Sequence, residues 1–250
     1  MMRSVYLLYG VIAYGIFFTT FLYLIAFVGN FPFVPRTIDR GLVSDLFPAL
    51  AINLVLISAF GLQHSVMARK SFKTLWPRVV PAPIERSTYV VFTSLVLIAM
   101  YCLWRPIPGD VWRVENVWLA GALWVVFAAG WGIVLLSTFL LNHFELFGLQ
   151  QVYLHARNRT PADPQFHQPL FYKLVRHPIY SGFFIAFWAT PHMTFGHLLF
   201  ALGMSTYMLI AIGYEERDLV ALFGPQYEAY RENVGMLAPR MGKGGGRAGT

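Results

Sequence analysis

Charged residues and cysteine are both scarce in this chain. Of its 250 residues, 12% are charged and 57% are hydrophobic, whereas about a quarter of the residues in a typical soluble domain are charged. The one cysteine, Cys102, lies within an apolar run and forms no intrachain disulfide, so we expect a small buried apolar residue there. This composition is typical of an integral membrane protein, and the length leaves no room beside the membrane helices for a separate soluble catalytic domain.

The sequence gives no support for a metal site or for a dinucleotide-binding domain. There is no His-Glu-x-x-His and no cysteine pair, and His192 and His197 are separated by a predicted turn, so no metal site is predicted. No Gly-x-Gly-x-x-Gly follows a predicted strand and opens a predicted helix, which excludes a Rossmann cofactor domain. The net charge of +7 comes from basic residues spread over the loops between apolar runs. We therefore assign it to orientation in the membrane and predict no nucleic-acid partner.

Four long apolar runs cover residues 5–28, 48–67, 88–104 and 117–141, and each approaches or exceeds the roughly 20 helical residues that span a bilayer. A last apolar region, 179–214, is interrupted at residues 190–194. Its first arm would be only about 18 Å long as a helix, too short to cross the membrane straight. The sequence predicts an all-α integral membrane protein with four long transmembrane helices, a C-terminal helical hairpin and a cytoplasmic tail.

The basic residues predict the orientation. Arg3 and the segments 68–87, 142–178 and 215–250 contain 15 of the 19 Lys and Arg residues. The other four lie in the alternate loops, at Arg36, Arg40, Arg105 and Arg113. Because Lys and Arg are enriched in cytoplasmic loops, we expect a bilayer partner and both termini in the cytoplasm. We expect one domain over residues 1–240 and a flexible tail over 241–250.

Two charged clusters border the hairpin, at residues 176–182 and 215–218. Charge beside hydrocarbon is costly and often marks a functional site in a membrane protein. Pro178 suits the first position of a helix, and the amide groups that follow it lack intrahelical partners. Together with Arg176 they could hold a carboxylate or a phosphate. The structural alternative is an interfacial anchor in which Arg176 reaches to the headgroups and Pro178 only starts a helix.

Other polar residues lie within or beside the long helices. Asn53 and His64 share one helical face and are expected to point inward together. His64 is either a site residue or a helix–helix hydrogen bond. Asn142, His143 and Glu145 are interleaved with Phe and Leu, which is typical of a small apolar pocket with a few polar groups. Solvation at the membrane interface is the alternative for these three.

The motif order resembles a known superfamily. Tyr-Lys-Leu-Val-Arg-His-Pro-Ile-Tyr-Ser-Gly (172–182), a short hairpin, Glu-Glu-Arg-Asp-Leu (215–219) and Phe-Gly-Pro-Gln-Tyr-Glu-Ala-Tyr (223–230) resemble the isoprenylcysteine carboxyl methyltransferases. The upstream segments 60–69, 85–89 and 141–149 resemble a narrower branch of nurim-like proteins, NnrU-like proteins and bacterial methanethiol S-methyltransferases. The similarity to the last of these runs almost end to end.

This resemblance implies methylation of methanethiol, a small volatile thiol, to dimethyl sulfide, with S-adenosyl-L-methionine bound at the cytoplasmic side by residues 170–240. The cofactor residues that it implies are Arg176, His177, Tyr180, Gly182, Tyr214, Glu215, Glu216 and Tyr227. A scaffold needs neither charged cluster, which favours an enzyme over a non-catalytic nurim-like protein.

A free thiol is mostly protonated at pH 7, so a base or a cationic neighbour helps the reaction. His143 is the first candidate base, with Glu145 beside it, and His64 is the second. Arg69 or Arg86 is a candidate partner for the thiolate. The predicted substrate contacts are Asn142, Phe144 and Phe147. A further alternative makes His64 and His143 the axial ligands of a haem.

Overall fold

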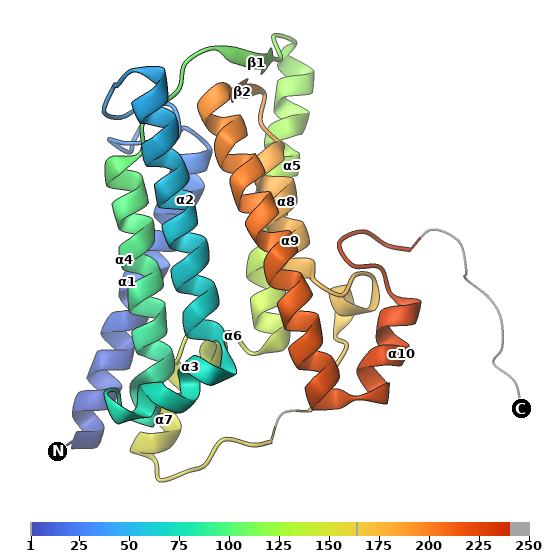
Figure 1. Ribbon diagram of the computed structural model, residues 1–250. Coiled ribbons are helices and arrows are strands. Elements are labelled where there is room, and N and C mark those ends of the chain that lie inside the picture. The colour runs from blue at the N-terminus through green and yellow to red at the C-terminus, as the bar shows by residue number, and fades with distance from the viewer. Residues whose placement is uncertain (1, 164, 241–250) are drawn as a thin grey trace, which may run out of the picture.

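The computed structural model describes residues 2–163 and 165–240, and this part of the chain is mostly helical (Figure 1). The bundle is formed by α1 (Met2–Val28), α2 (Leu46–Ala68), α4 (Glu85–Leu103), α5 (Val117–Leu141), α8 (Pro178–Trp188) and α9 (Phe195–Phe223). Shorter helices are α3 (Lys70–Leu75), η1 (Trp76–Arg78), η2 (Ala82–Ile84), α6 (His143–Leu146), α7 (Leu149–Ala156), η3 (Leu170–Lys173) and α10 (Pro225–Asn233). The predicted tail, 241–250, lies outside the described residues.

Every bundle helix except α8 is long and apolar enough to cross a membrane. The predicted architecture, four long helices followed by a hairpin with one short arm, is confirmed. One predicted boundary was wrong. Helix α9 has 29 residues and continues to Phe223, so Glu215 and Glu216 lie inside the helix rather than after it.

The hairpin turns where the sequence predicts a break. Helix α8 begins with Pro178 at its first turn and ends at Trp188, before Pro191. The connection forms strand β2 (His192–Thr194), which pairs antiparallel with β1 (Asp110–Arg113) from the loop before α5. Thr194 then caps α9, because its side chain accepts a hydrogen bond from the His197 amide at 3.1 Å. These contacts tie the turn to the rest of that end of the bundle.

The bundle helices alternate in direction (Figure 1). The small sheet lies at one end of the bundle, and α3, α7 and α10 lie at the other. The beginning of α1 is also at the α10 end, so the basic segments 69–84 and 142–177 lie there together. The even number of passes agrees with the predicted topology, and the membrane side on which this end lies stays a prediction.

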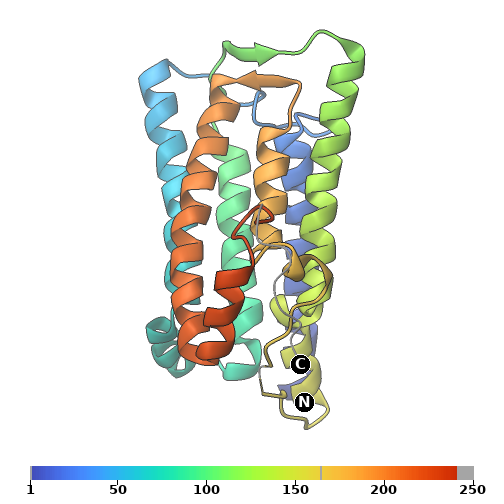
Figure 2. The same cartoon turned by 90° about the vertical axis from the view of Figure 1, so that its right-hand side faces the viewer.

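Helices α5 and α8 approach each other closely (Figure 2). A Cβ atom on Gly182 would lie 2.7 Å from the carbonyl oxygen of Gly130, and one on Gly130 would lie 2.7 Å from the Ala186 amide nitrogen. Only glycine permits this backbone contact. The structure therefore gives Gly182 a packing role, and its predicted contact with a cofactor is untested.

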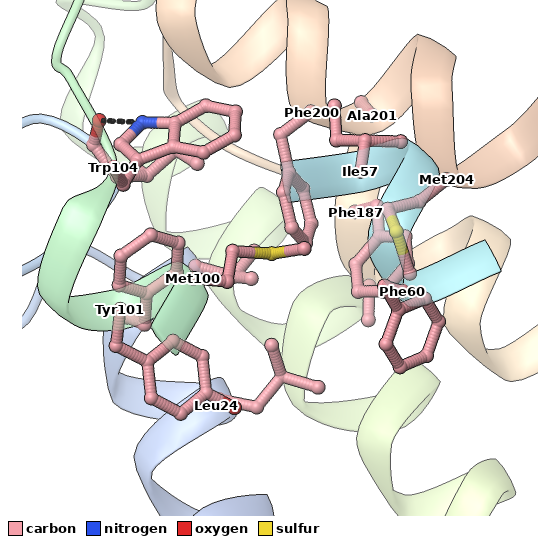
Figure 3. Close-up of a cluster of buried hydrophobic side chains, with 14 of the residues drawn as sticks. Leu24, Ile57, Phe60, Met100, Tyr101, Trp104, Phe187, Phe200, Ala201 and Met204 are labelled. Atoms are coloured by element: carbon pink, nitrogen blue, oxygen red, sulfur yellow. Dashed lines mark hydrogen bonds between the residues drawn. The ribbon is translucent and has the colours of Figure 1, made fainter. Parts of the chain in front are cut away.

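The apolar core fills the half of the bundle nearest the sheet. Met100, Trp104, Phe187 and Phe200 are almost fully buried at the adjoining ends of α4, α8 and α9 (Figure 3). The indole nitrogen of Trp104 donates to the carbonyl of Ile38 at 3.0 Å, so its polar atom is satisfied. Close packing at this end leaves the polar side chains of the charged clusters at the opposite end.

Two expectations about single residues need correction. Cys102 is exposed rather than buried. It lies on the same face of α4 as Leu95 and Ile98, which are also exposed. Asn53 is fully buried, as expected, but it pairs with Arg105 at the sheet end: its amide nitrogen donates to the Arg105 carbonyl at 2.7 Å, and its oxygen accepts from the Arg105 amide. Asn53 thus has a structural role away from His64.

Candidate active site

The two charged clusters of the sequence meet in the structure. Arg176 Nε donates to Glu216 Oε1 at 2.7 Å, and His177 Nε2 lies 3.1 Å from the same oxygen. The side chains of Arg176 and Glu216 are only 11% and 13% exposed. The Glu215 carboxylate lies beside them, 4.0 Å from His177 Nδ1. A largely buried ion pair therefore joins the start of α8 to the last third of α9.

The last turn of α10 and the chain after it enclose this pair. Arg176 Nη1 donates to the carbonyl oxygens of Arg231, at 3.0 Å, and Val234. The Arg176 amide donates to the Gly235 carbonyl at 2.8 Å. Most of the guanidinium is thus occupied by Glu216 and by backbone carbonyls. Arg176 organises three segments of the chain, and its predicted contact with a carboxylate ligand is not tested by this geometry.

An aromatic wall stands beside the ion pair, formed by Phe166, Tyr172, Tyr227 and Tyr230. The Tyr230 hydroxyl donates to the carbonyl of Tyr172. Tyr227 is only 2% exposed, and its buried hydroxyl has no hydrogen-bond partner among the described residues. Burial and the nearby Glu216 carboxylate raise the pKa of Tyr227, so the hydroxyl stays protonated. A buried hydroxyl without a partner indicates where a polar atom of a ligand would bind.

Tyrosines and a histidine lie deeper between α2, α4, α8 and α9. Tyr180 interacts with the Glu215 carboxylate and lies near Tyr89 and Tyr207. The His64 ring centroid is 5.0 Å from that of Tyr89 and 6.2 Å from that of Tyr207. Glu215, whose side chain is 46% exposed, therefore connects the ion-pair cluster to this interior group.

Arg69 covers one of the predicted cofactor residues. Its Cζ atom lies 3.4 Å from the ring centroid of Tyr214, and Arg217 approaches the same ring at 5.5 Å. A guanidinium over an aromatic face is attracted by about 0.5–2 kcal/mol. This contact holds the junction of α2 and α3 against α9, one residue before Glu215.

A cavity of about 420 Å³ opens near the same end of the bundle, lined by Lys73, Ala82, Glu85, Arg86, Leu141, Asn142, Glu145, Leu146 and Gln151. Its volume is in the range of small-molecule sites. Arg86 Nε donates to the Leu146 carbonyl at 2.9 Å, and Asn142 Nδ2 donates to Glu145 Oε2 at 2.9 Å. Burial and the Arg86 charge lower the pKa of Lys73. Three predicted residues, Arg86, Asn142 and Glu145, come together here.

His143 lies in a separate aromatic enclosure. Its Nε2 atom is 2.7 Å from the Tyr14 hydroxyl, and its Nδ1 atom is 2.8 Å from Thr138 Oγ1. Burial lowers the pKa of His143, so the ring is neutral. Three phenylalanine rings contact its imidazole: Phe139, Phe144 and Phe147. Phe139 stacks on the imidazole at 4.2 Å.

The two candidate bases are therefore in different surroundings. The ring contacts of His143 come from α1, α5 and α6, and those of His64 come from α2, α4 and α9. Sequence reasoning missed Tyr89 and Tyr207. Their signal was weak: Tyr207 ends a short Ser-Thr-Tyr stretch within an apolar run, and Tyr89 follows Glu-Arg-Ser-Thr. In the described part of the chain, no group of three or more His, Cys, Asp or Glu residues could hold a metal ion.

Comparison with known proteins gives close relatives. Methanethiol S-methyltransferase 1 of Bradyrhizobium diazoefficiens is 52% identical over 93% of this chain and 81% of its own length. Methanethiol S-methyltransferase of Mycobacterium tuberculosis is 49% identical over 96% of this chain and 98% of its own length. Nurim of Sus scrofa is 29% identical over 68% of each chain. No family model matches the sequence, and no solved structure matches it.

Proposed function

Since the chain belongs to the methanethiol S-methyltransferase family, we propose that it methylates methanethiol to dimethyl sulfide, with S-adenosyl-L-methionine as the methyl donor. The observation that carries the proposal is the identity of about half of all residues along almost the whole chain. The likeness to nurim is weaker and shorter, so a purely structural role has less support.

The residues around the ion pair fit the proposed donor. The half-exposed carboxylate of Glu215 suits its ammonium group or its ribose hydroxyls, and the unpartnered Tyr227 hydroxyl suits one of its polar atoms. His177 and the free amides at the start of α8 suit its carboxylate. Because Arg176 and Glu216 largely satisfy each other, we assign them to holding the hairpin against the segment after α10.

Tyr180 and Tyr214 remain candidates for contact with the nucleoside, beside Glu215 on α8 and α9. S-adenosyl-L-methionine supplies an electrophilic methyl group on a sulfonium, so the protein mainly has to bring a thiolate into line with it. The candidates for handling the thiol are His64, His143 and the cationic side chains of Arg69 and Arg86.

A haem held by His64 and His143 has less support. A bis-histidine haem needs a free ring nitrogen on each ligand, and both nitrogens of His143 are within hydrogen-bond distance of hydroxyl groups. The rings of His64 and His143 also contact side chains from different helices, and no described residue contacts both rings. We therefore keep the histidines as candidates for proton transfer.

We assign the protein to the bacterial inner membrane, with both termini and the donor site at the cytoplasmic side. Five apolar helices make it an integral membrane protein. The basic segments at the α10 end favour the cytoplasm for that end, and a cytosolic supply of the methyl donor agrees with it. The proposed partners are a small volatile thiol and the bilayer, with no nucleic acid.

Headspace gas chromatography tests the activity. Membranes that contain the protein, supplied with S-adenosyl-L-methionine and methanethiol, should release dimethyl sulfide, and membranes without the protein should not. Methanethiol should be the best acceptor, ethanethiol slower, and a prenylcysteine inactive, since aromatic rings surround both candidate histidines and leave little room for a large acceptor. One extra methylene on the substrate is worth about 1–3 kcal/mol of discrimination between two acceptors. Equal turnover of a prenylcysteine would contradict the assigned substrate class.

A further inference from the structure

Four side chains from four helices converge inside the bundle: His64 of α2, Tyr89 of α4, Tyr180 of α8 and Tyr207 of α9. We call them the tyrosine chamber. The His64 ring contacts both Tyr89 and Tyr207, and Tyr180 lies near both tyrosines. None of the three tyrosines contacts the ring of His143. The chamber is therefore a separate group of side chains with its own histidine.

The side chains of the chamber are not fully covered. Each of the four lies close to side chains of other helices, yet each keeps an intermediate exposed fraction. Side chains of the close-packed core are fully covered, as Met100 and Phe187 are in the other half of the bundle. A small molecule of about the size of water can therefore touch the chamber side chains.

The hydrogen bonds of His64 determine its tautomer. Thr93 Oγ1 donates its single hydrogen to the Tyr89 carbonyl at 3.0 Å. The same oxygen lies 3.3 Å from His64 Nδ1, so it accepts a hydrogen there and Nδ1 is the protonated nitrogen. Nε2 then carries the lone pair, and no described side chain hydrogen-bonds to it. His64 thus presents an available proton acceptor.

The hydrogen bonds of His143 leave it no free acceptor nitrogen. Thr138 Oγ1 donates to the Leu135 carbonyl at 2.7 Å, so it accepts from His143 Nδ1. His143 Nε2 must then accept a hydrogen from the Tyr14 hydroxyl at 2.7 Å. Its lone pair is occupied and an aromatic enclosure surrounds the ring. Only one of the two candidate bases has a free acceptor nitrogen.

We propose that the tyrosine chamber binds the methyl acceptor and that His64 Nε2 is the base that takes the thiol proton. This inference rests on the proposed function. The S–H bond breaks and its proton passes to Nε2, while the sulfur electron pair forms the new S–C bond to the donated methyl. The electron pair of the broken C–S bond remains on the donor sulfur, which loses its positive charge. His64 afterwards releases the proton to water.

The charges around the chamber suit this step. Arg86 acts electrostatically on His64 and Tyr89, Arg69 acts on Tyr207, and Glu215 acts on Tyr180 and Tyr207. Both cationic side chains favour a thiolate in the chamber. Arg86 opposes a positive charge on His64, so the imidazolium depends on the thiolate that forms beside it and loses its proton once the sulfur is methylated. Aromatic faces attract a cationic sulfonium. Glu215 joins the chamber to the proposed donor site, which brings acceptor and donor together.

The first experiment compares His64→Gln with His143→Gln in the full-length protein. Glutamine retains hydrogen bonding but takes up no proton. His64→Gln should lower kcat at pH 7 by at least about 100-fold, and its log kcat should rise with pH as the thiol ionises unaided. Its affinity for S-adenosyl-L-methionine, measured by calorimetry, should equal that of the wild type. His143→Gln should keep the pH profile of the wild type.

A His64→Gln variant with the kcat and pH profile of the wild type would overturn the inference. A His143→Gln variant that gains the pH-dependent slope would move the base to the aromatic enclosure. If the wild type itself forms no dimethyl sulfide, the proposed function is contradicted, whereas the binding of a small sulfur compound in the chamber is not. A second experiment therefore tests access to the chamber without turnover.

The second experiment uses methyl methanethiosulfonate, which transfers a CH₃S group to a cysteine with loss of methanesulfinate. In a Cys102→Ser background, Thr93→Cys places a thiol beside His64 and should gain one CH₃S group by mass spectrometry, while a bulky maleimide leaves it unmodified. The neighbouring Ser94 is 1% exposed, so Ser94→Cys is the control and should react with neither reagent. A Thr93→Cys protein as unreactive as this control would overturn the chamber.

Discussion

The hydrogen bonds that each side chain makes distinguish the residues of this site. His64 and His143 have the same tautomer because each donates from Nδ1 to a threonine hydroxyl whose own hydrogen is already used. What differs is the second nitrogen, which faces the Tyr14 hydroxyl in His143 and has no described partner in His64. Tyr227 similarly has a buried hydroxyl without a partner. Such residues are where chemistry or a ligand is expected.

Tyr227→Phe separates ligand binding from stability. Removing an unpartnered buried hydroxyl should leave the Tm of the ligand-free protein unchanged or slightly higher, since no hydrogen bond is lost. The affinity for S-adenosyl-L-methionine should fall about tenfold, equivalent to about 1.4 kcal/mol. Tyr230→Phe is the matched control: it leaves the buried Tyr172 carbonyl without its donor, so its Tm should fall. A lower Tm for Tyr227→Phe than for Tyr230→Phe would contradict this assignment.

His143 should make stability depend on pH. Burial lowers the pKa of His143 in the folded protein below its ordinary value of about 6.5. The unfolded chain therefore binds this proton first on acidification, so the free energy of unfolding falls as the pH drops below about 6.5. His143→Gln should show a smaller loss of Tm between pH 7.5 and pH 5 than the wild type. Identical losses would mean that this residue is not buried as a neutral ring.

The residue types of the site were predictable from the sequence, but their pairing was not. Arg176, His177, Glu215 and Glu216 stand out because charges beside apolar runs are rare. That Arg176 pairs with Glu216 and with backbone carbonyls at and just after the end of α10 depends on contacts between segments far apart in the chain. Sequence reasoning likewise ranked His143 above His64, because Tyr14 comes from another helix and its hydrogen bond leaves no local signal.

Among the helices, α8 has the strongest constraint on its position. It is only 11 residues long, and Gly182 on it meets Gly130 on α5 backbone to backbone. The same helix carries Tyr180 and follows directly after Arg176 and His177. Its short length and the break at Pro191 were predictable, because hydropathy and proline are local signals. The glycine contact was not, because the sequence alone does not say which helices are neighbours.

Gly182→Ala tests this helix contact. The added methyl would lie 2.7 Å from the Gly130 carbonyl oxygen, so α5 and α8 must separate. We expect a loss of about 1–3 kcal/mol in stability and weaker binding of S-adenosyl-L-methionine as α8 shifts. Gly132→Ala on α5 is the control, because nothing lies within 4 Å of its added Cβ, and better helix propensity should raise its Tm. Equal Tm changes in both variants, measured by thermal unfolding in detergent, would contradict the packing role.

The two ends of the molecule differ in role: one holds the packed core and the other carries the candidate site. Its aromatic core lies near the small sheet, and its charged and hydroxyl-bearing groups lie toward α10 (Figures 1 and 3). The number of spans and the common end of the basic segments followed from composition, because the cost of placing charge in hydrocarbon acts on every residue independently of the fold. The inward tyrosine chamber depends on the arrangement of four helices and had no comparable signal.

Orientation can be measured with an impermeant maleimide on intact cells, in a Cys102→Ser background. Val43 is 90% exposed in the loop before α2, and Val79 is 78% exposed between α3 and α4. Because the basic segments favour the cytoplasm, Val43→Cys should react from outside, and Val79→Cys should react only after the cells are lysed. The reverse pattern would put the basic end and the donor site outside the cell.

The most direct test of the central claim follows the methyl group itself. Purified protein in lipid vesicles is given methanethiol and S-adenosyl-L-methionine whose transferable methyl carries three deuterium atoms, and the headspace is analysed by gas chromatography with mass detection. We expect dimethyl sulfide that is three mass units heavier, formed at least about 100-fold more slowly by His64→Gln at pH 7. Dimethyl sulfide without the label, or none above protein-free vesicles, would contradict methyl transfer from this donor to methanethiol.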